Sequence, residues 1–103
     1  MEVFVSPAAQ QDIILATQWY EDQRAGLGQS FAHQLRAALL SAAAQPTRCS
    51  PVTDVLRKIK LDVFPYVAVF EVRGRQLRVI AILGAGQDWD AILQNRFQSR
   101  GSS

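Results

Sequence analysis

The sequence has little of what metal-binding, disulfide-bonded and membrane proteins need. Cys49 is the only cysteine and His33 the only histidine in 103 residues. An internal disulfide is therefore excluded, and there is no cluster of thiolates or imidazoles for a metal. No apolar run is long enough to span a membrane. Residues 1–5 show neither a basic start nor an apolar run of signal length. We therefore expect a cytoplasmic protein without membrane contact, metal or cofactor.

The length and hydrophobic content predict one small domain with a single modest core. We place this domain at residues 1–98 and expect residues 99–103 to be a flexible tail. Charge is unevenly spread: residues 1–47 hold two basic and four acidic side chains, whereas residues 48–103 hold nine basic and five acidic ones. The excess of basic residues in the second half is a weak indication of an anionic partner. Solvated charges at the rim of a sheet explain this excess equally well.

Residues 61–83 are the stretch around which the chain is organised. Two runs rich in Val, Ile, Phe and Tyr meet at residues 73–75, where Gly74 supplies the positive φ of a tight β-hairpin. Alternation predicts a shared face within each run, made of Tyr66, Ala68, Phe70 and Val72 in the first and of Leu77, Val79, Ala81 and Leu83 in the second. Both faces of the hairpin are largely apolar, so both should be covered.

The first half of the chain predicts a strand at residues 2–5 and two helices. Ser6-Pro7 is typical of a helix start, and an apolar stripe follows through Ala9, Ile13, Ala16 and Tyr20. A short connection with two glycines leads to a second stripe through Phe31, Leu35, Leu39 and Ala42. Short connections join antiparallel neighbours, so we expect a helical hairpin. We expect Ile13, Phe31 and Leu35 to pack against Phe70 and Ile80.

The remaining segments complete an α+β fold. Residues 45–54 have the composition of an irregular connector, and residues 55–60 alternate as a strand does. Gly84-Ala85-Gly86 ends the last strand, after which Asp88 or Asp90 caps a short helix through Ile92, Leu93 and Phe97. The predicted fold has an N-terminal strand, an antiparallel helical hairpin on a mainly antiparallel sheet, and a short C-terminal helix.

The residues available for chemistry are few. His33 lies off the apolar stripe of its helix and is interpreted as a surface residue, and Cys49 is favoured as structural over nucleophilic. What remains is a basic set on the predicted sheet, with Tyr66 beside it: Arg57, Lys58, Lys60, Arg73, Arg75 and Arg78. Such cations can hold phosphates, but they also serve to keep the edges of a sheet soluble.

Several motifs, in their order and spacing, resemble a known family. They are Ser6-Pro7-Ala8-Ala9, the run Trp19 to Gly28 (WYEDQRAGLG), Leu56-Arg57, Phe64-Pro65-Tyr66 before a Gly-turn hairpin, and the strand Val79 to Leu83. Together they resemble the RelE/ParE superfamily of bacterial toxins from type II toxin-antitoxin systems. The resemblance covers nearly the whole chain and implies the fold predicted above.

The resemblance implies three alternative functions. RelE-like members cut messenger RNA on the ribosome without metal, for which the catalytic residues here would be Arg57, Lys58, Lys60 and Tyr66. ParE-like members inhibit DNA gyrase by binding it, for which the candidate contact residues are Arg57, Lys58, Arg78, Trp89, Arg96 and Arg100. A degenerate member would only bind its antitoxin.

Two positions favour the ParE-like alternative. Members often carry a His and an Arg just after the last strand, but Gly84 and Gln87 stand at those positions here. Their loss removes a proton-transfer group and a phosphate clamp. The expected partners are then a cognate antitoxin and DNA gyrase, with operator DNA reached only through the antitoxin. No catalytic residue is assigned on this interpretation.

Overall fold

The fold is organised around a five-stranded sheet. The computed structural model describes the backbone of residues 1–101 and the side chains of residues 1–96. The strands lie in the order β1-β5-β4-β3-β2. Their bounds are β1 (Glu2–Val5), β2 (Ser50–Pro51), β3 (Arg57–Lys60), β4 (Tyr66–Arg73) and β5 (Gln76–Gly84). β1 runs parallel to β5, and the other neighbours are antiparallel. The predicted α+β fold class is confirmed.

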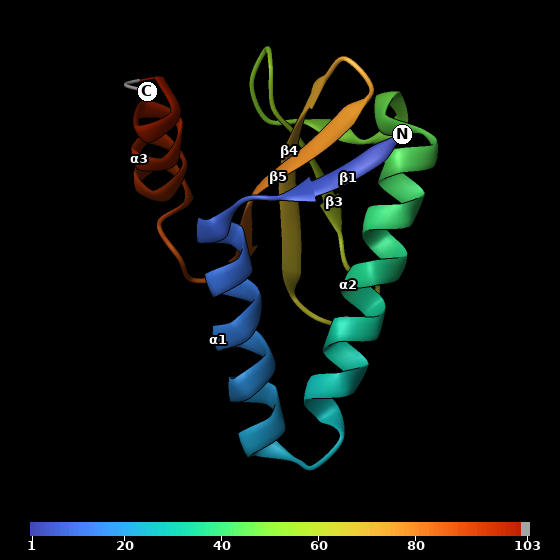
Figure 1. Ribbon diagram of the computed structural model, residues 1–103. Coiled ribbons are helices and arrows are strands. Elements are labelled where there is room, and N and C mark those ends of the chain that lie inside the picture. The colour runs from blue at the N-terminus through green and yellow to red at the C-terminus, as the bar shows by residue number, and fades with distance from the viewer. Residues whose placement is uncertain (102–103) are drawn as a thin grey trace.

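Two helices, α1 (Pro7–Gln23) and α2 (Leu27–Ala44), form the expected helical hairpin. Figure 1 shows them meeting at the bottom of the view, well below the sheet. The amide of Ala9 donates to the Ser6 hydroxyl, which is the predicted N-terminal cap. Gly26 turns the chain with φ +89°, and the Glu21 carboxylate accepts from the amides of Gly26 and Gly28. The Glu21 carboxylate thus provides acceptors for amides at the N-terminus of α2, where a negative charge is also favourable.

The helical hairpin covers one face of the sheet. Both predicted apolar stripes contribute to the core beneath it, although Ile13 is only partly buried. The buried sheet side chains in this first core come from the two long strands, β4 and β5, and the loop before β4 adds Leu61 and Phe64. The fully enclosed members of the whole core are Ala9, Phe31, Ala42, Leu61, Ala68, Phe70, Leu77, Val79 and Ile82. The predicted contact face of Phe70 is therefore confirmed.

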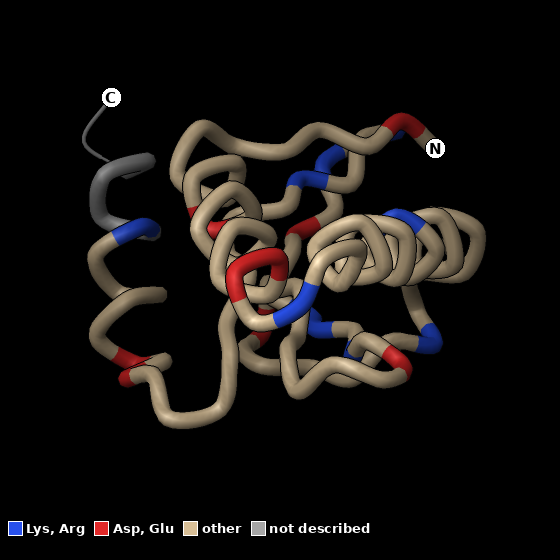
Figure 2. Tube along the Cα trace, turned by 90° about the horizontal axis from the view of Figure 1, so that it is seen from below, with Lys and Arg blue, Asp and Glu red and all other residues tan. Residues whose placement is uncertain are grey.

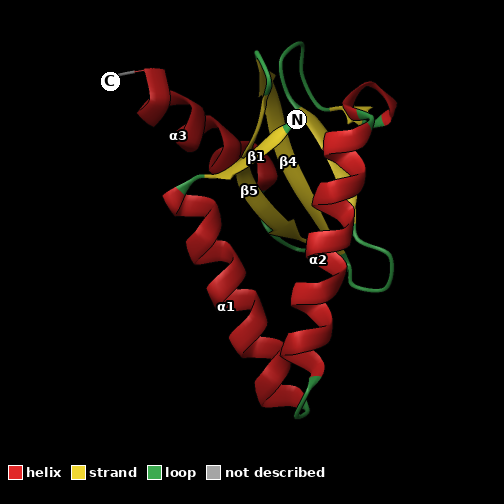
Figure 3. Cartoon of the chain, turned by 45° about the vertical axis from the view of Figure 1, so that its right-hand side comes forward, coloured by secondary structure: helices red, strands yellow, loops and turns green. Residues whose placement is uncertain are grey.

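A smaller core lies on the opposite face, under α3 (Trp89–Gly101) and the loop before β3. Leu56 and Leu93 close it over four sheet residues, Val69, Ile80, Ala81 and Leu83. Asp88 caps α3 by accepting from the amide of Ala91. Figure 3 shows α3 standing apart from the helical hairpin, near the end of β1. The chain itself therefore covers part of the second face.

A β-bulge interrupts the alternation that the sequence predicts for β5. The register passes from Val69 opposite Ala81 to Phe70 opposite Val79, so Ile80 is an extra residue in β5. Beyond this bulge the two faces exchange places. Ala81 and Leu83 lie under α3, while Ile82 joins the first core. The expected packing of Ile80 with Ile13, Phe31 and Leu35 is wrong, because Ile80 lies in the second core.

Two boundaries also differ from the sequence expectation. The connector at residues 45–54 contains the 3-10 turn η1 (Pro46–Arg48) and the short strand β2. β3 begins at Arg57 rather than at residue 55, because a local turn holds the preceding residues. In that turn the Thr53 hydroxyl accepts from the amides of Val55 and Leu56. α3 runs to Gly101 and includes the predicted helix through Ile92, Leu93 and Phe97. The domain bounds 1–98 and the flexible tail at 99–103 stay predictions.

Candidate functional site

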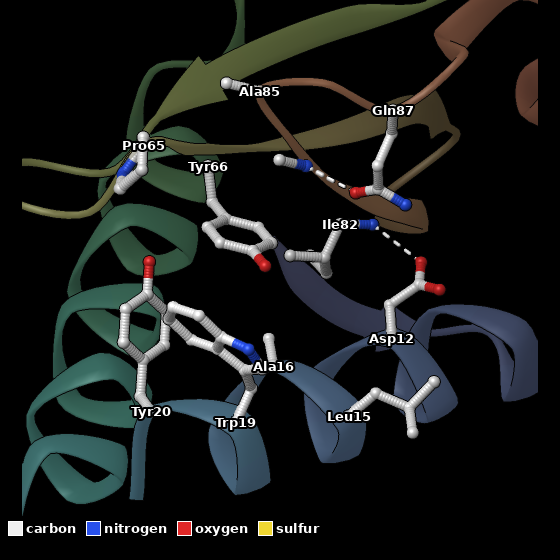
Figure 4. A pocket seen from close by; sticks show the side chains of 11 residues that line it. Asp12, Leu15, Ala16, Trp19, Tyr20, Pro65, Tyr66, Ile82, Ala85 and Gln87 are labelled. Carbon is white, nitrogen blue, oxygen red and sulfur yellow. Dashed lines mark hydrogen bonds between the residues drawn. The ribbon is translucent and has the colours of Figure 1, made fainter. Parts of the chain in front are cut away.

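A pocket lies between α1 and the connection from β5 to α3. It has a volume of about 420 Å³. We call it the Trp19 pocket, after the aromatic side chain at its rim. Figure 4 shows its lining residues: Asp12, Leu15, Ala16, Trp19, Tyr20, Pro65, Tyr66, Ile82, Gly84, Ala85 and Gln87. It brings together residues from three segments that are far apart in the sequence.

The floor of the pocket depends on a glycine under a tyrosine ring. Tyr66 opens β4 directly opposite Gly84, the last residue of β5. A Cβ at Gly84 would lie 2.9 Å from Cζ of Tyr66 and 3.0 Å from Cε2, which is too close for real atoms. The missing side chain therefore allows the Tyr66 ring to lie against the strand. In Figure 4 the Tyr66 hydroxyl points into the pocket.

The connection after β5 is held by side chains that return to Gly84. Its amide donates to Oε1 of Gln87 at 2.6 Å, and its carbonyl accepts from Nε1 of Trp89 at 3.0 Å. Gly86 turns the chain with φ +91°. Because Oε1 of Gln87 is engaged, Nε2 is the polar atom that this side chain can offer to a ligand.

The far end of the pocket is an ion pair that also seals the edge of β5. β1 pairs only with Gln76 to Val79, so the next outward-facing groups of β5 need other partners. The Asp12 carboxylate accepts from the amide of Ile82 at 2.9 Å, and Arg96 donates to the carbonyl of Ile80. Arg96 also donates to both carboxylate oxygens of Asp12. This bidentate pair fastens α3 to α1.

An aromatic cluster supports the inner wall. Tyr20 stacks on Phe31, with ring centroids 5.3 Å apart, and meets Phe64 edge-on at 4.7 Å. Trp19 in turn meets Tyr20 edge-on at 5.0 Å. Burial raises the pKa of Tyr20, and the neighbouring Tyr66 hydroxyl raises it further. Both contributions oppose ionisation of the Tyr20 hydroxyl at high pH.

The sheet separates the four residues considered for ribonuclease chemistry. Arg57 lies opposite Phe70 and donates to the carbonyl of Cys49 at 2.7 Å. Lys58 and Lys60 lie opposite Val69 and Val67, on the face toward α3, and Nζ of Lys58 lies 5.5 Å from the ring centre of Trp89. Tyr66 packs with the first core on the other face. These four side chains do not meet at one place.

The candidate contact residues for a protein target are similarly dispersed. Arg78 lies over the Phe4 ring at 5.1 Å. Trp89 begins α3 and contacts Lys58, whereas Arg96 faces Asp12 and not open solvent. Figure 2 shows the Lys and Arg positions of the described residues spread along the trace. The side chain of Arg100 lies outside the described part, and a contact role for this set stays a prediction.

The other singled-out residues have ordinary surroundings. His33 is exposed on α2, as expected from its place off the stripe. Cys49 is half-buried, and burial raises the pKa of its thiol, although Arg57 acts in the opposite direction. Sequence reasoning missed Leu15 and Trp19 as pocket residues. Their signal is visible in the sequence, because both are large apolar residues outside the buried stripe of α1.

The fold and the pocket define a small α+β protein in which a helical hairpin packs on a sheet. A family model described as "ParE toxin of type II toxin-antitoxin system, parDE" matches residues 3–89. The chain therefore belongs to the ParE toxin family. The matched region contains the whole Trp19 pocket and ends where α3 begins.

A solved structure agrees with this assignment. It is described as the chromosomal ParDE TA system from P. aeruginosa, and it superposes with a TM-score of 0.72 at 14% identity. The match covers 82% of this chain and 95% of the other. At this identity the likeness shows the fold alone. No curated protein matches the chain.

None of the helices within the described residues is long and apolar enough to cross a bilayer. The same residues contain no group of three or more His, Cys, Asp or Glu side chains placed to hold a metal ion.

Proposed function

We propose that this ParE-family toxin inhibits DNA gyrase by binding it and that a cognate antitoxin neutralises it. The proposal rests on the residue types at two positions. They are Gly84 and Gln87 in this chain, whereas related toxins often have a His and an Arg there. Gly84 has no side chain to move a proton, and the Tyr66 ring occupies the space above it. Gln87 is a neutral amide whose oxygen is engaged by the Gly84 amide.

Messenger cleavage would have to proceed without those two groups. A phosphodiester transition state needs proton transfer and stabilisation of the developing charge. Arg57, Lys58 and Lys60 are cations, but the sheet separates Arg57 from the two lysines. Tyr66 is distant from Arg57 in register, since Tyr66 begins β4 whereas Arg57 on β3 pairs with Phe70 further along that strand. Binding to a target requires no such convergence and therefore fits the chain better.

The exposed apolar side chains support a protein antitoxin. Leu40 on α2 is more than half exposed and lines an apolar groove together with Val3 and Ile13. Exposed apolar surface on a small domain marks a binding site for another protein. An antitoxin that covers this surface would stabilise the free chain by mass action. Because gyrase acts on chromosomal DNA, the proposed activity belongs in the bacterial cytoplasm.

The test uses one preparation of the purified chain in two assays. We expect inhibition of gyrase supercoiling that disappears when equimolar antitoxin is added, and we expect ribosome-bound messenger RNA to stay intact. Codon-specific cuts that vanish in Tyr66→Phe would replace the proposal with the ribonuclease. A chain that binds antitoxin but inhibits neither system would identify a degenerate member.

A further inference from the structure

We infer that the Trp19 pocket receives one apolar side chain from a loop of the target protein, and this inference rests on the proposed binding of gyrase. The rim is the first observation. Leu15 is 60% exposed and Trp19 is 56% exposed, and both line the pocket from α1. Large side chains held half in water beside a cavity are typical anchors of protein interfaces, where Trp contributes most.

The size of the pocket limits what can enter. Its volume of about 420 Å³ is near the lower end of the roughly 300–1,000 Å³ found for ligand sites. Figure 4 shows Pro65 and Ala85 at one end and Asp12 at the other. An amphipathic helix needs anchors over several turns, whereas a loop needs a place for only one. A single pocket of this size therefore favours a loop.

The polar atoms of the pocket define the chemistry of the occupant. The Asp12 carboxylate already accepts from Arg96 and Ile82, and Oε1 of Gln87 accepts from Gly84. The lining side chains can then offer mainly donors, which are Nε2 of Gln87, Nε1 of Trp19 and the Tyr66 hydroxyl. A loop supplies matching acceptors as main-chain carbonyls. The occupant is thus an apolar side chain next to exposed peptide carbonyls.

Charge argues against nucleic acid in the same pocket. Binding of a strand depends on cations that hold its phosphates. Among the described side chains that line the pocket, none is Lys or Arg, and Asp12 is the single charged one. Aromatic rings alone would offer stacking without this electrostatic support. The pocket therefore suits a protein loop better than a base.

A separate groove leaves room for the antitoxin. It lies between β1, α1 and α2, has a volume of about 250 Å³, and is lined by Val3, Ile13, Ala32, Leu35, Arg36, Leu39 and Leu40. All but one of these residues are apolar. This groove has none of the polar floor that marks the Trp19 pocket. Two partners of different chemistry can thus be distinguished by substitutions in the two places.

The experiment compares substitutions in the full-length chain. Trp19→Ala removes the rim, and Ala85→Leu fills the pocket from the opposite wall. Ile14→Ala is the matched control, because Ile14 is 58% exposed, adjacent to Leu15, and outside the pocket. Circular dichroism confirms folding of each variant. Inhibition of gyrase supercoiling and affinity for the antitoxin are then measured side by side.

We expect Trp19→Ala and Ala85→Leu to weaken gyrase inhibition at least tenfold while antitoxin affinity changes less than threefold. Ile14→Ala should match the wild type in both assays. Folded pocket variants that inhibit gyrase like the wild type would overturn the inference alone. A loss of antitoxin affinity with gyrase inhibition retained would also overturn the inference, because the antitoxin would then occupy the Trp19 pocket. A wild-type chain without effect on gyrase would overturn the proposed function itself.

Discussion

Removal of the Asp12 carboxylate should destabilise the protein more than any other single change at a polar side chain of the site. Asp12→Ala deletes the acceptor for Ile82 and both acceptors for Arg96. The two charged side chains are only 15% and 20% exposed. Breaking a buried ion pair costs about 3–5 kcal/mol, and the remaining exposure places this case at about 3 kcal/mol.

That loss is large for a domain of this size. Small proteins are stable by about 5–15 kcal/mol, and about 3 kcal/mol lowers the melting temperature by roughly 12–24 °C. Urea unfolding followed by circular dichroism measures the loss directly. Asp12→Asn keeps an acceptor for Ile82 but not the charge, so it should lose about half as much.

Asp22→Ala is the control, because Asp22 is an exposed carboxylate on the same helix. It should change the free energy of unfolding by less than about 0.5 kcal/mol. A double-mutant cycle with Arg96→Ala should give a coupling energy of at least about 1 kcal/mol. An Asp12→Ala protein as stable as Asp22→Ala would refute the role of this pair in holding α3.

Three other predictions concern the core and the pocket. Phe70→Ala should lower the free energy of unfolding by about 3–5 kcal/mol through a cavity in the first core, whereas His33→Ala should leave it unchanged in the same urea titration. Gly84→Ala should cost about 1–3 kcal/mol because the new Cβ displaces the Tyr66 ring, and the cost should shrink when Tyr66→Ala is added. The raised pKa of Tyr20 means that the unfolded chain releases this proton before the folded chain does, so stability should fall as pH rises above about 10. Tyr20→Phe should reduce that fall in thermal melts recorded from pH 8 to 11, and an unchanged pH dependence would exclude Tyr20 as its source.

The sequence predicted the elements well because each has a local signal. Ser6-Pro7 marks the start of α1, and Gly74, with φ +59°, forms the turn between β4 and β5. Periodicity of 3.6 residues identified the buried stripes of both helices. These features depend on residues that are close together in the chain, so they can be recognised from the sequence alone.

The bulge and the pocket depend on contacts between distant segments. Strict alternation cannot reveal that Ile80 is an extra residue in β5, because the register is set by pairing with β4. Arg96 was predicted as a docking residue from its charge, but its partner Asp12 is 84 positions away. Leu15 and Trp19 are recognisable as apolar residues off the stripe, and only the fold places them in one pocket with Gln87.

The most direct test of the account is a paired assay on the same purified chain. Gyrase supercoiling and cleavage of ribosome-bound messenger RNA are measured over the same concentrations, with and without the antitoxin. The account predicts that supercoiling is inhibited, that messenger RNA stays intact, and that the antitoxin abolishes the inhibition. Intact supercoiling together with codon-specific cuts lost in Lys60→Ala or Tyr66→Phe would contradict it.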